Sequence, residues 1–384
     1  MIQKNSSKNT ISREFSFIHA SDLHLGSHQY RNEERTNDFI DALKQILDLA
    51  KVHQVDFILL GGDVFNALEM LPGKLMEIIA IFKQFKVDVN NRIKIVAIEG
   101  NHDIRKHSFG VRFKHRGQSW LKLLASWDLL ILLDVDLNAV PKQIFRDYNF
   151  KTQSGGKIRI KDAIIYGTRY LGETPKDELV KIMESIEKDD GLFHILLQHF
   201  GIEGKMENVP GLPYKDLKLL KEHIDYLALG HFHLQFTIDD WVFNPGSSEA
   251  ACTSDFFFKR SVFLVKVLYN QKYKKKVIEL KLNNRKAIWI KLNFKLPFSN
   301  KEQMNNYILN SLRMEMQKRE TVILALYSNK NPCLFLKLGG IKPFTTCKVN
   351  KKELEHLIYE QFPVVDVKIY QKYTEPVKSI ISYL

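Results

Sequence analysis

The sequence has few cysteines: Cys252, Cys333 and Cys347 are the only three among 384 residues. No two of them form a C-x-x-C pair, and three cysteines do not make an even set of bridges. Zinc ribbons and small disulfide-stapled domains both need closely spaced cysteines, so the sequence favours neither class. This cysteine usage is typical of a reducing compartment, and we expect the protein to be cytoplasmic.

Long apolar runs are also absent. A membrane-spanning helix needs about 18 consecutive apolar residues, whereas the longest candidate, "DLLILLDVDL", is short and interrupted by aspartates. The start of the sequence, "MIQKNSSKNTISREFSF", is polar and lacks the apolar middle of a secretory signal. We therefore expect no membrane partner, and we expect residues 1–14 to form a polar N-terminal tail.

Acidic residues are scarce in the last third of the chain. The whole sequence has 57 Lys and Arg against 44 Asp and Glu, a formal net charge of +13. Residues 259–384 hold 25 of the basic and 9 of the acidic residues, which leaves 32 against 35 for residues 1–258. The second part thus carries about +16 and the first about −3. Such asymmetry suggests a polyanionic partner, because clustered cations release counterions when they meet phosphates. A solvated lysine-rich surface is the alternative.

The chain is longer than an average domain, and its 45% apolar content suffices for at least one large core. From residue 15 onward, apolar runs such as "FSFIHA", "VDFILLGGD" and "FHILLQH" alternate with segments of helical periodicity, including residues 33–53 and 213–223. This alternation predicts an α/β fold with a sheet flanked by helices. A boundary at "LPFSNKEQ" divides a main domain, residues 15–296, from a small basic α/β unit, residues 297–384.

Five polar motifs each follow the carboxyl end of a predicted apolar strand. They are "ASDLHLG" with Asp22 and His24, "LLGGDVF" with Asp63, "IEGNHD" with Asn101 and His102, "LLQHFG" with His199, and "LGHFH" with His231 and His233. Taken singly, each motif is weak, because a lone D-x-H or G-D is common. Ligands of open α/β sheets, however, collect outside the carboxyl ends of the strands. We therefore expect these eight side chains to converge on one site.

The chemistry of this set is that of a metal site. It offers two carboxylates, one amide oxygen and several imidazoles, without a thiolate. Such oxygen and nitrogen donors suit Mn²⁺, Fe²⁺ or Zn²⁺. Seven ligands are too many for one tetrahedral ion but fit two ions that share a carboxylate, and Asp63, alone in its motif, is the expected bridge. We expect His231 and His233 to bind one ion each, because alternate residues beyond a strand end can serve ions about 3.5–4 Å apart.

The combination of D-x-H, G-D, G-N-H-[DE], H and G-H-x-H motifs resembles the calcineurin-like metallophosphoesterase superfamily. Within it, "FIHASDLHLGS", "VDFILLGGDVF", "VAIEGNHD" and "FNPGSSE" are most similar to the archaeal and bacterial double-strand-break repair nucleases of the SbcD type. The resemblance covers about residues 15–295. It implies an α/β fold in which a two-sheet sandwich is flanked by helices and followed by a small C-terminal capping domain.

The resemblance also assigns the candidate ligands to two ions, with Mn²⁺ as the family's usual metal. Asp22, His24, Asp63 and His233 would hold one ion, and Asp63, Asn101, His199 and His231 would hold the other. His102 would assist the leaving oxygen or the transition-state charge. That general-acid role suits an imidazole at neutral pH.

One position departs from the family, and one segment is unusually basic. The repair nucleases usually carry a histidine three residues after the bridging aspartate, where this chain has Asn66. Asparagine can donate a hydrogen bond to phosphate but cannot carry a proton. The segment "IRKHSFGVRFKHRG" holds five cations that are candidates for contact with a nucleic-acid backbone: Arg105, Lys106, Arg112, Lys114 and Arg116. A solvated loop is the alternative.

These features lead to the hypothesis of a two-metal DNA nuclease, exonuclease or endonuclease, in double-strand-break repair, whose basic C-terminal unit grips duplex ends. The resemblance implies a coiled-coil ABC ATPase as partner. The apolar stripe at residues 75–85 most simply packs a helix on the sheet, whereas the resemblance implies that this helix and the one near Trp120 form a homodimer. Two alternatives stay open. A phosphodiesterase for small nucleotides would not need the basic C-terminal part, and a DNA-binding scaffold subunit with weak turnover would be compatible with Asn66.

Overall fold

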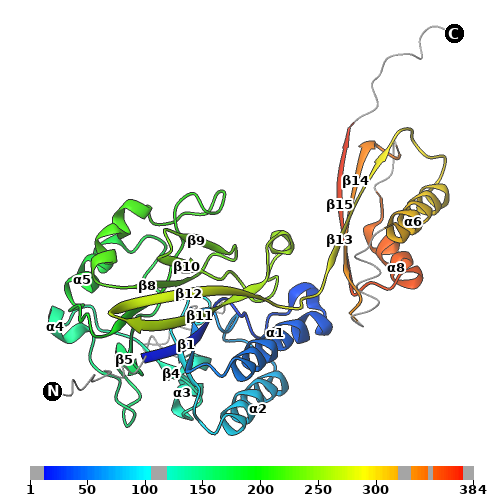
Figure 1. Cartoon of the computed structure of the whole chain (residues 1–384). Coiled ribbons are helices and arrows are strands. Elements are labelled where there is room, and N and C mark those ends of the chain that lie inside the picture. Colours follow the sequence, from blue (N-terminus) through cyan, green and yellow to red (C-terminus); the bar gives the residue numbers. More distant parts are fainter. Residues whose placement is uncertain (1–12, 105–118, 319–329, 345–348, 375–384) are drawn as a thin grey trace, which may run out of the picture. The chain divides into compact units, whose positions relative to one another are not determined.

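The computed structural model describes residues 13–104, 119–318, 330–344 and 349–374. Of the expected N-terminal tail, residues 1–12 therefore lie outside the described residues, and the first strand begins at Arg13. The chain forms two compact units (Figure 1). The first unit comprises the residues up to Gln29 together with Arg35–Asn283, and the second comprises Tyr30–Glu34 together with the residues from Asn284 onward.

The second unit begins before the boundary expected at residues 296 and 297. Strand β13 (Ala287–Phe294) precedes that boundary, yet it pairs along its whole length with β14 (Cys333–Ile341) in the sheet of the second unit. A segment from near the N-terminus also belongs to this unit. Asn32 Nδ2 donates to the carbonyl oxygen of Val365 at 2.6 Å, and Arg285 forms an ion pair with Glu34 at 3.2 Å. The second unit is therefore discontinuous in sequence.

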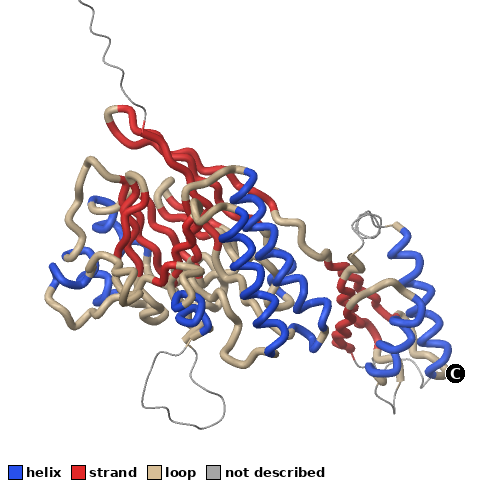
Figure 2. Tube along the Cα trace, turned by 90° about the horizontal axis from the view of Figure 1, so that it is seen from below, coloured by secondary structure: helices blue, strands red, loops and turns tan. Residues whose placement is uncertain are grey.

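The first unit contains two six-stranded sheets, of which the first has the order β12-β11-β1-β2-β3-β4. The bounds are β1 Arg13–Ala20, β2 Phe57–Leu60, β3 Lys94–Ala97, β4 Ile131–Leu132, β11 Ser261–Asn270 and β12 Lys272–Lys281. Strands β1 to β4 run parallel, so their carboxyl ends lie along one edge. The helices that pack on one face of this sheet are α1 (Glu33–Val52), α2 (Pro72–Asp88) and α3 (Trp120–Ser126) (Figure 2).

The second sheet has the order β5-β6-β7-β8-β10-β9. The bounds are β5 Lys157–Ile160, β6 Ala163–Gly167, β7 Phe193–His199, β8 Tyr226–Gly230, β9 Phe236–Ile238 and β10 Val242–Asn244. Strands β6, β7 and β8 run parallel. Its outer face is covered by α4 (Pro141–Ile144), α5 (Lys176–Glu184) and η2 (Tyr214–Glu222). The helix predicted at residues 213–223 is thus present, but as a 3₁₀ helix.

The two sheets pack face to face. Along β1, Phe17 faces the second sheet while Ile18 and Ala20 face the helices, as the alternation of a strand requires. Phe17 stacks on Phe57 with ring centroids 4.9 Å apart, and it meets Tyr226 of the second sheet edge-on at 5.3 Å. The predicted two-sheet sandwich flanked by helices is confirmed.

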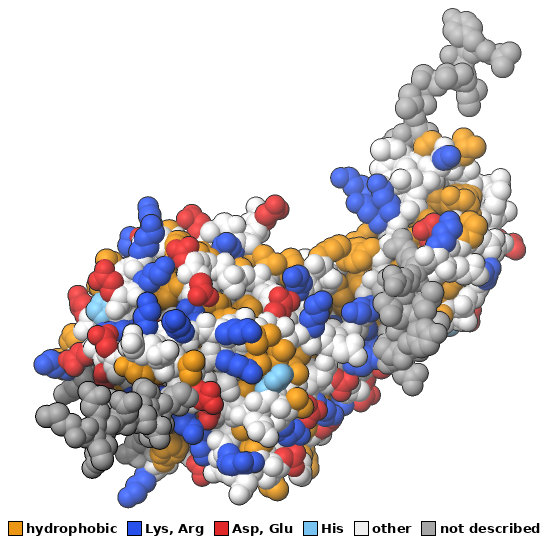
Figure 3. Space-filling view, in the orientation of Figure 1, with side chains coloured by type: hydrophobic (Ala, Val, Ile, Leu, Met, Phe, Trp, Pro, Cys, Tyr) orange, Lys and Arg blue, Asp and Glu red, His pale blue; other side chains and the backbone are white. Residues whose placement is uncertain are grey.

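The described residues of the second unit form a parallel sheet of three strands, β13-β14-β15, in which β15 spans Asp366–Thr374. Helices α6 (Lys301–Gln317) and α8 (Lys351–Gln361) cover one of its faces (Figure 2), and Lys and Arg side chains gather on the side away from them (Figure 3). The predicted strand "TVILALY" lies outside the described residues.

None of the described helices combines the length and the apolar content that a membrane crossing requires.

Candidate metal centre

The predicted site residues come together where strands of the two sheets end. In the first sheet, β1 is followed by Asp22 and His24, β2 by Asp63, and β3 by Asn101 and His102. In the second sheet, β7 ends at His199, and β8 is followed by His231 and His233. Hydrogen bonds join the two sets of strand ends. His231 N donates to Asp22 Oδ2 at 3.0 Å, and His199 Nδ1 donates to the carbonyl oxygen of Gly61 at 2.7 Å.

Four of these residues have a left-handed backbone. The φ angles are 51° at Asp22, 47° at His24, 49° at Asp63 and 88° at His231. Residues with a side chain adopt this conformation rarely, and the surrounding structure must hold them in it. The sharp turns direct the side chains out of the strand path and into the centre. Gly62 also has a positive φ, 90°, and a Cβ there would meet the ring of His199, so glycine is required at this approach.

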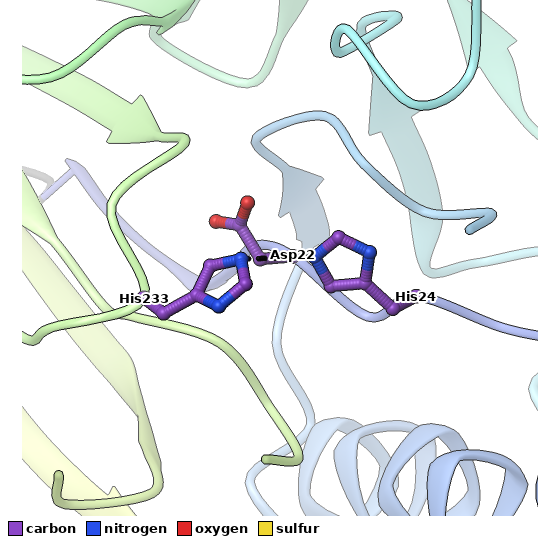
Figure 4. Close-up of side chains that lie close together, drawn as sticks. All are labelled: Asp22, His24 and His233. Atoms are coloured by element: carbon purple, nitrogen blue, oxygen red, sulfur yellow. Dashed lines mark hydrogen bonds between the residues drawn. The ribbon is translucent and has the colours of Figure 1, made fainter. Parts of the chain in front are cut away.

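One group of donors comprises Asp22, His24 and His233, whose ligand atoms all lie within 4.8 Å of one another. The Nε2 atoms of His24 and His233 are 3.0 Å apart, and the Asp22 carboxylate lies beside them (Figure 4). Asp22 and His24 are both buried. Two imidazole nitrogens that face one place next to a carboxylate suit a divalent cation that binds between them.

A second group forms around Asn101. Its Oδ1 atom lies 3.1 Å from His199 Nε2 and 3.0 Å from His231 Nδ1. His199 Nε2 also lies 3.4 Å from Asp63 Oδ2. Because His199 Nδ1 donates to a backbone carbonyl oxygen, Nε2 is the nitrogen that remains to face the centre.

Asp63 lies between the two groups. Its carboxylate forms one compact set of donors with His24 and His102, and another with Asp22 and His199. The donors are oxygen and imidazole nitrogen, and they divide into two sets that share one carboxylate. The residues therefore fit two divalent ions bridged by Asp63, although ligation by each of the seven residues remains a prediction.

Burial and close contacts shift the pKa values of these groups in opposite directions. Burial alone would raise the pKa of Asp63, but His199 and the neighbouring imidazoles hold it below its usual range. Burial alone would lower the pKa of His199, but Asp63 raises it to about 9. Burial lowers the pKa of both His24 and His231 to about 3. A bound cation must replace the proton on His199, so we expect cation affinity to rise as the pH rises toward that value.

His102 is held beside these donors by contacts with the backbone. Its Nδ1 donates to the carbonyl oxygen of Asn66 at 2.9 Å, and its backbone N–H donates to Asp63 Oδ1 at 2.7 Å. Its ring meets that of His24 edge-on, with centroids 4.8 Å apart. Asn66 thus positions His102 through its main chain, a contact that any residue type supplies. Contact of the Asn66 side chain with phosphate remains a prediction.

Asp255 contributes to the centre, although no sequence motif indicated it. Its Oδ2 atom accepts a hydrogen bond from His233 Nδ1 at 2.7 Å, and the backbone N–H groups of Ala251 and Cys252 donate to the same oxygen. Burial would lower the pKa of His233, but the hydrogen bond to Asp255 raises it to about 10. The contact leaves Nε2 of His233 to face the other donors, and carboxylates in this position orient metal-binding imidazoles. Asp255 lies in the 3₁₀ helix η3 (Ser254–Phe257) and not at a strand end.

Asp255→Asn is expected to weaken Mn²⁺ binding at one of the two positions by roughly 10- to 100-fold. Asparagine keeps the shape of the side chain but removes the charge that holds the His233 ring. Titration calorimetry on EDTA-stripped protein measures the change. Asp239→Asn makes the same substitution at an exposed residue and should leave binding unchanged. Equal affinities of the Asp255 variant and the unaltered chain would contradict this positioning role.

Tyr170 is a second residue near the centre that the motifs missed. Its ring centroid lies 5.9 Å from that of His199 and 5.8 Å from that of His231. Burial raises the pKa of Tyr170, so the hydroxyl stays protonated and can donate a hydrogen bond to an anion. The sequence could have indicated Tyr170, because this residue closely follows the apolar strand "AIIYG", as the other site residues follow theirs.

The five cations of the basic segment lie outside the described residues. They are Arg105, Lys106, Arg112, Lys114 and Arg116. Their expected contact with a nucleic-acid backbone remains a prediction.

Comparison with known proteins agrees with this geometry. A family model described as calcineurin-like phosphoesterase matches residues 15–235, which include all seven predicted ligands. The DNA double-strand break repair protein Mre11 of Saccharolobus solfataricus is 28% identical over 221 residues, 58% of this chain and 50% of that protein. Mre11 of Sulfurisphaera tokodaii is 28% identical over 221 residues, which are 56% of this chain and 48% of that protein. The uncharacterized metallophosphoesterase YhaO of Bacillus subtilis is 29% identical over 252 residues, which are 62% of this chain and 54% of that protein.

The chain spans about half the length of these curated relatives. The family match nevertheless covers more than half of the chain itself and includes the strand ends at which the two groups of donors meet. The chain therefore belongs to the calcineurin-like phosphoesterase family, whose members hydrolyse phosphoester bonds.

Proposed function

We propose that the protein is a two-metal-dependent DNA nuclease of double-strand-break repair. The observation that carries the proposal is the position of Asp63, whose carboxylate lies within reach of both groups of donors. The relatives named as double-strand break repair proteins support DNA as the substrate. The 25 basic residues within 259–384 also support a polymeric anion, because a small nucleotide needs no extended cationic surface.

The reaction would be hydrolysis of a phosphodiester bond. Two divalent ions, for which we propose Mn²⁺, would supply positive charge at the phosphoryl oxygens and lower the pKa of the attacking water. His102, held by the carbonyl oxygen of Asn66, would give a proton to the leaving oxygen as its bond to phosphorus breaks. The products would be one phosphate monoester and one free hydroxyl.

The proposed partners follow from the resemblance and from the surface. The basic second unit would contact DNA, and a coiled-coil ABC ATPase would be the partner in break repair. A homodimer would form through α2 and α3. Exposed apolar side chains support a contact surface there, since Met76 of α2 is 70% exposed and Trp127, which follows α3, is 46% exposed.

A nuclease assay with the purified chain tests the proposal on blunt, hairpin and single-stranded DNA. We expect Mn²⁺ to support the release of nucleotides and EDTA to stop it. Asp63→Asn should reduce the rate to that of the EDTA-treated protein, because the shared ligand loses its charge. Asp239→Asn, the same change at an exposed residue, should leave the rate unchanged.

Two other outcomes would replace the proposal with a different function. Turnover of cyclic mononucleotides or bis(p-nitrophenyl) phosphate without DNA hydrolysis would indicate a phosphodiesterase for small substrates. DNA binding without hydrolysis of any phosphodiester would indicate a scaffold subunit.

A further inference from the structure

The sheet of the second unit has two chemically different faces. Alternate residues of β13, including Ile288, Ile290 and Leu292, pack against α6 and α8. The residues between them therefore point to the opposite face, where Trp289 is half-buried and Lys291 is exposed. Because β13, β14 and β15 are paired in parallel, the register of the strands shows which residues of β14 and β15 share this face.

Exposed lysines gather on this open face. Lys291 pairs in register with Lys337 of the neighbouring strand, and Lys372 lies on the same face of β15. All three side chains are exposed, and no ion pair joins any of them to a described carboxylate, whereas Lys368 on the same face pairs with Asp366 at 3.4 Å. Like charges directly opposite each other in a sheet are unfavourable. Figure 3 shows the resulting collection of Lys and Arg side chains on the side of the unit away from its helices. The face is therefore suited to an anion.

An exposed aromatic ring lies among these lysines. Tyr370 is 41% exposed and pairs in register with Lys337, while Lys368 and Lys372 flank it along its own strand and on the same face. Near the beginning of the strands, Phe335 is buried on this face and stacks on Trp289 with ring centroids 4.3 Å apart, so the exposed part of the face lies toward the ends of the strands. A cationic surface with an exposed aromatic side chain is the arrangement that binds unpaired nucleotides, because phosphates meet the cations while a base stacks on the ring.

We propose that the open face of β13, β14 and β15 binds a single strand of DNA. Lys291, Lys337 and Lys372 contact its phosphates, and Tyr370 stacks on a base. Duplex DNA fits this face less well, because its bases are already stacked and its grooves are read by a protruding helix or ribbon. The inference rests on the proposed function, which makes DNA the substrate, and it adds that the second unit holds an unpaired strand.

The first test is equilibrium binding by the full chain in EDTA, which keeps the measurement independent of the metal centre. Fluorescence anisotropy follows a labelled oligothymidine and a blunt duplex at several salt concentrations. The triple variant Lys291→Gln, Lys337→Gln, Lys372→Gln should bind the single strand roughly 10- to 100-fold more weakly at low salt. The slope of log affinity against log salt should fall by about 2, since each phosphate contact on a single strand contributes about 0.7.

A matched variant makes the same charge change on the helical side of the unit. Lys301→Gln, Lys351→Gln, Lys352→Gln alters three exposed lysines of α6 and α8 and should leave both the affinity and the salt slope unchanged. Equal weakening by both triple variants would show a diffuse effect of net charge and would overturn the proposal. Circular dichroism of each variant shows whether the fold is intact.

The second test separates stacking from charge. Tyr370→Ala should weaken binding of the single strand by about 5-fold or more without changing the salt slope, whereas Tyr370→Phe should bind like the unaltered chain. A Tyr370→Ala variant that binds the single strand normally, or that weakens duplex binding to the same extent, would overturn the proposal.

Failure of this inference differs from failure of the proposed function. If the lysine variant binds single strands normally while Mn²⁺-dependent DNA hydrolysis persists, only the inference fails. If the unaltered chain binds no DNA yet hydrolyses bis(p-nitrophenyl) phosphate, the proposed DNA substrate fails, and the inference fails with it.

Discussion

His102→Asn is expected to lower the kcat of DNA hydrolysis by about 10²- to 10⁴-fold, the usual contribution of a positioned general acid. Asparagine cannot carry the proton that the leaving sugar oxygen needs. Nδ1 of His102 is engaged by the carbonyl oxygen of Asn66, so Nε2 is the atom that remains for the substrate. Affinity for Mn²⁺ and for DNA should change little, and single-turnover rates with saturating metal measure the effect.

The leaving group provides a sharp control for this role. p-Nitrophenolate leaves without a proton, so hydrolysis of bis(p-nitrophenyl) phosphate should fall far less in the His102 variant than hydrolysis of DNA. His53→Asn, the same change just after α1 and outside the centre, should leave both rates unchanged. Equal losses on both substrates, or loss of Mn²⁺ binding by His102→Asn, would show that the residue acts other than as a proton donor.

Arg35→Met is expected to lower the free energy of unfolding of the first unit by about 3–5 kcal/mol, because it leaves buried carboxylates without their cation. Arg35 is fully buried in α1 and forms ion pairs with Asp38 at 2.6 Å and with Glu249 at 3.0 Å. The loop that holds Glu249 also contacts the metal centre, where Ser248 N donates to the carbonyl oxygen of Asp22 at 3.3 Å. Loss of Arg35 should therefore loosen the first donor group as well as the core.

Lys51→Met is the matched control, because Lys51 is a cation on the same helix that also pairs with two carboxylates, Asp48 at 2.8 Å and Asp88 at 3.2 Å. Its pairs are solvent-accessible, so water screens them and the loss of stability should be much smaller. Urea unfolding followed by tryptophan fluorescence reports mainly on the first unit, which contains Trp120, Trp127 and Trp241. Equal losses in the two variants would contradict a structural role for the buried network.

The position of each site residue on the chain determines whether the sequence could predict it. Asp22, Asp63 and His231 lie within three residues of the ends of buried strands, and parallel strands bring such positions to one edge of a sheet. Asp255 reaches His233 from a short 3₁₀ helix, and its placement depends on backbone hydrogen bonds from neighbouring residues. No periodic pattern marks such a residue, because its role depends on a tertiary contact alone.

The same holds for the fold: elements with a local sequence pattern could be predicted, but pairings that depend on tertiary contacts could not. Helix α1 and strand β7 could be predicted, because burial of one face or of a whole strand leaves a local apolar pattern. The sequence pattern of β13 shows that it is a strand, but it does not show that its partner is β14, which follows α6 in the chain. For residues 214–222, the apolar spacing predicted a helix, but it did not distinguish the 3₁₀ from the α form.

The participation of residues 30–34 in the second unit affects how the chain can be dissected. A truncation after Asn283 would remove Val365 and Arg285, which bind Asn32 and Glu34. That stretch immediately precedes Arg35 and lies between the D-x-H motif and the rest of α1. In the shortened polypeptide, the residues that lead into α1 would lose these contacts. A minimal catalytic fragment would therefore need a redesigned sequence at residues 30–34 as well as the truncation.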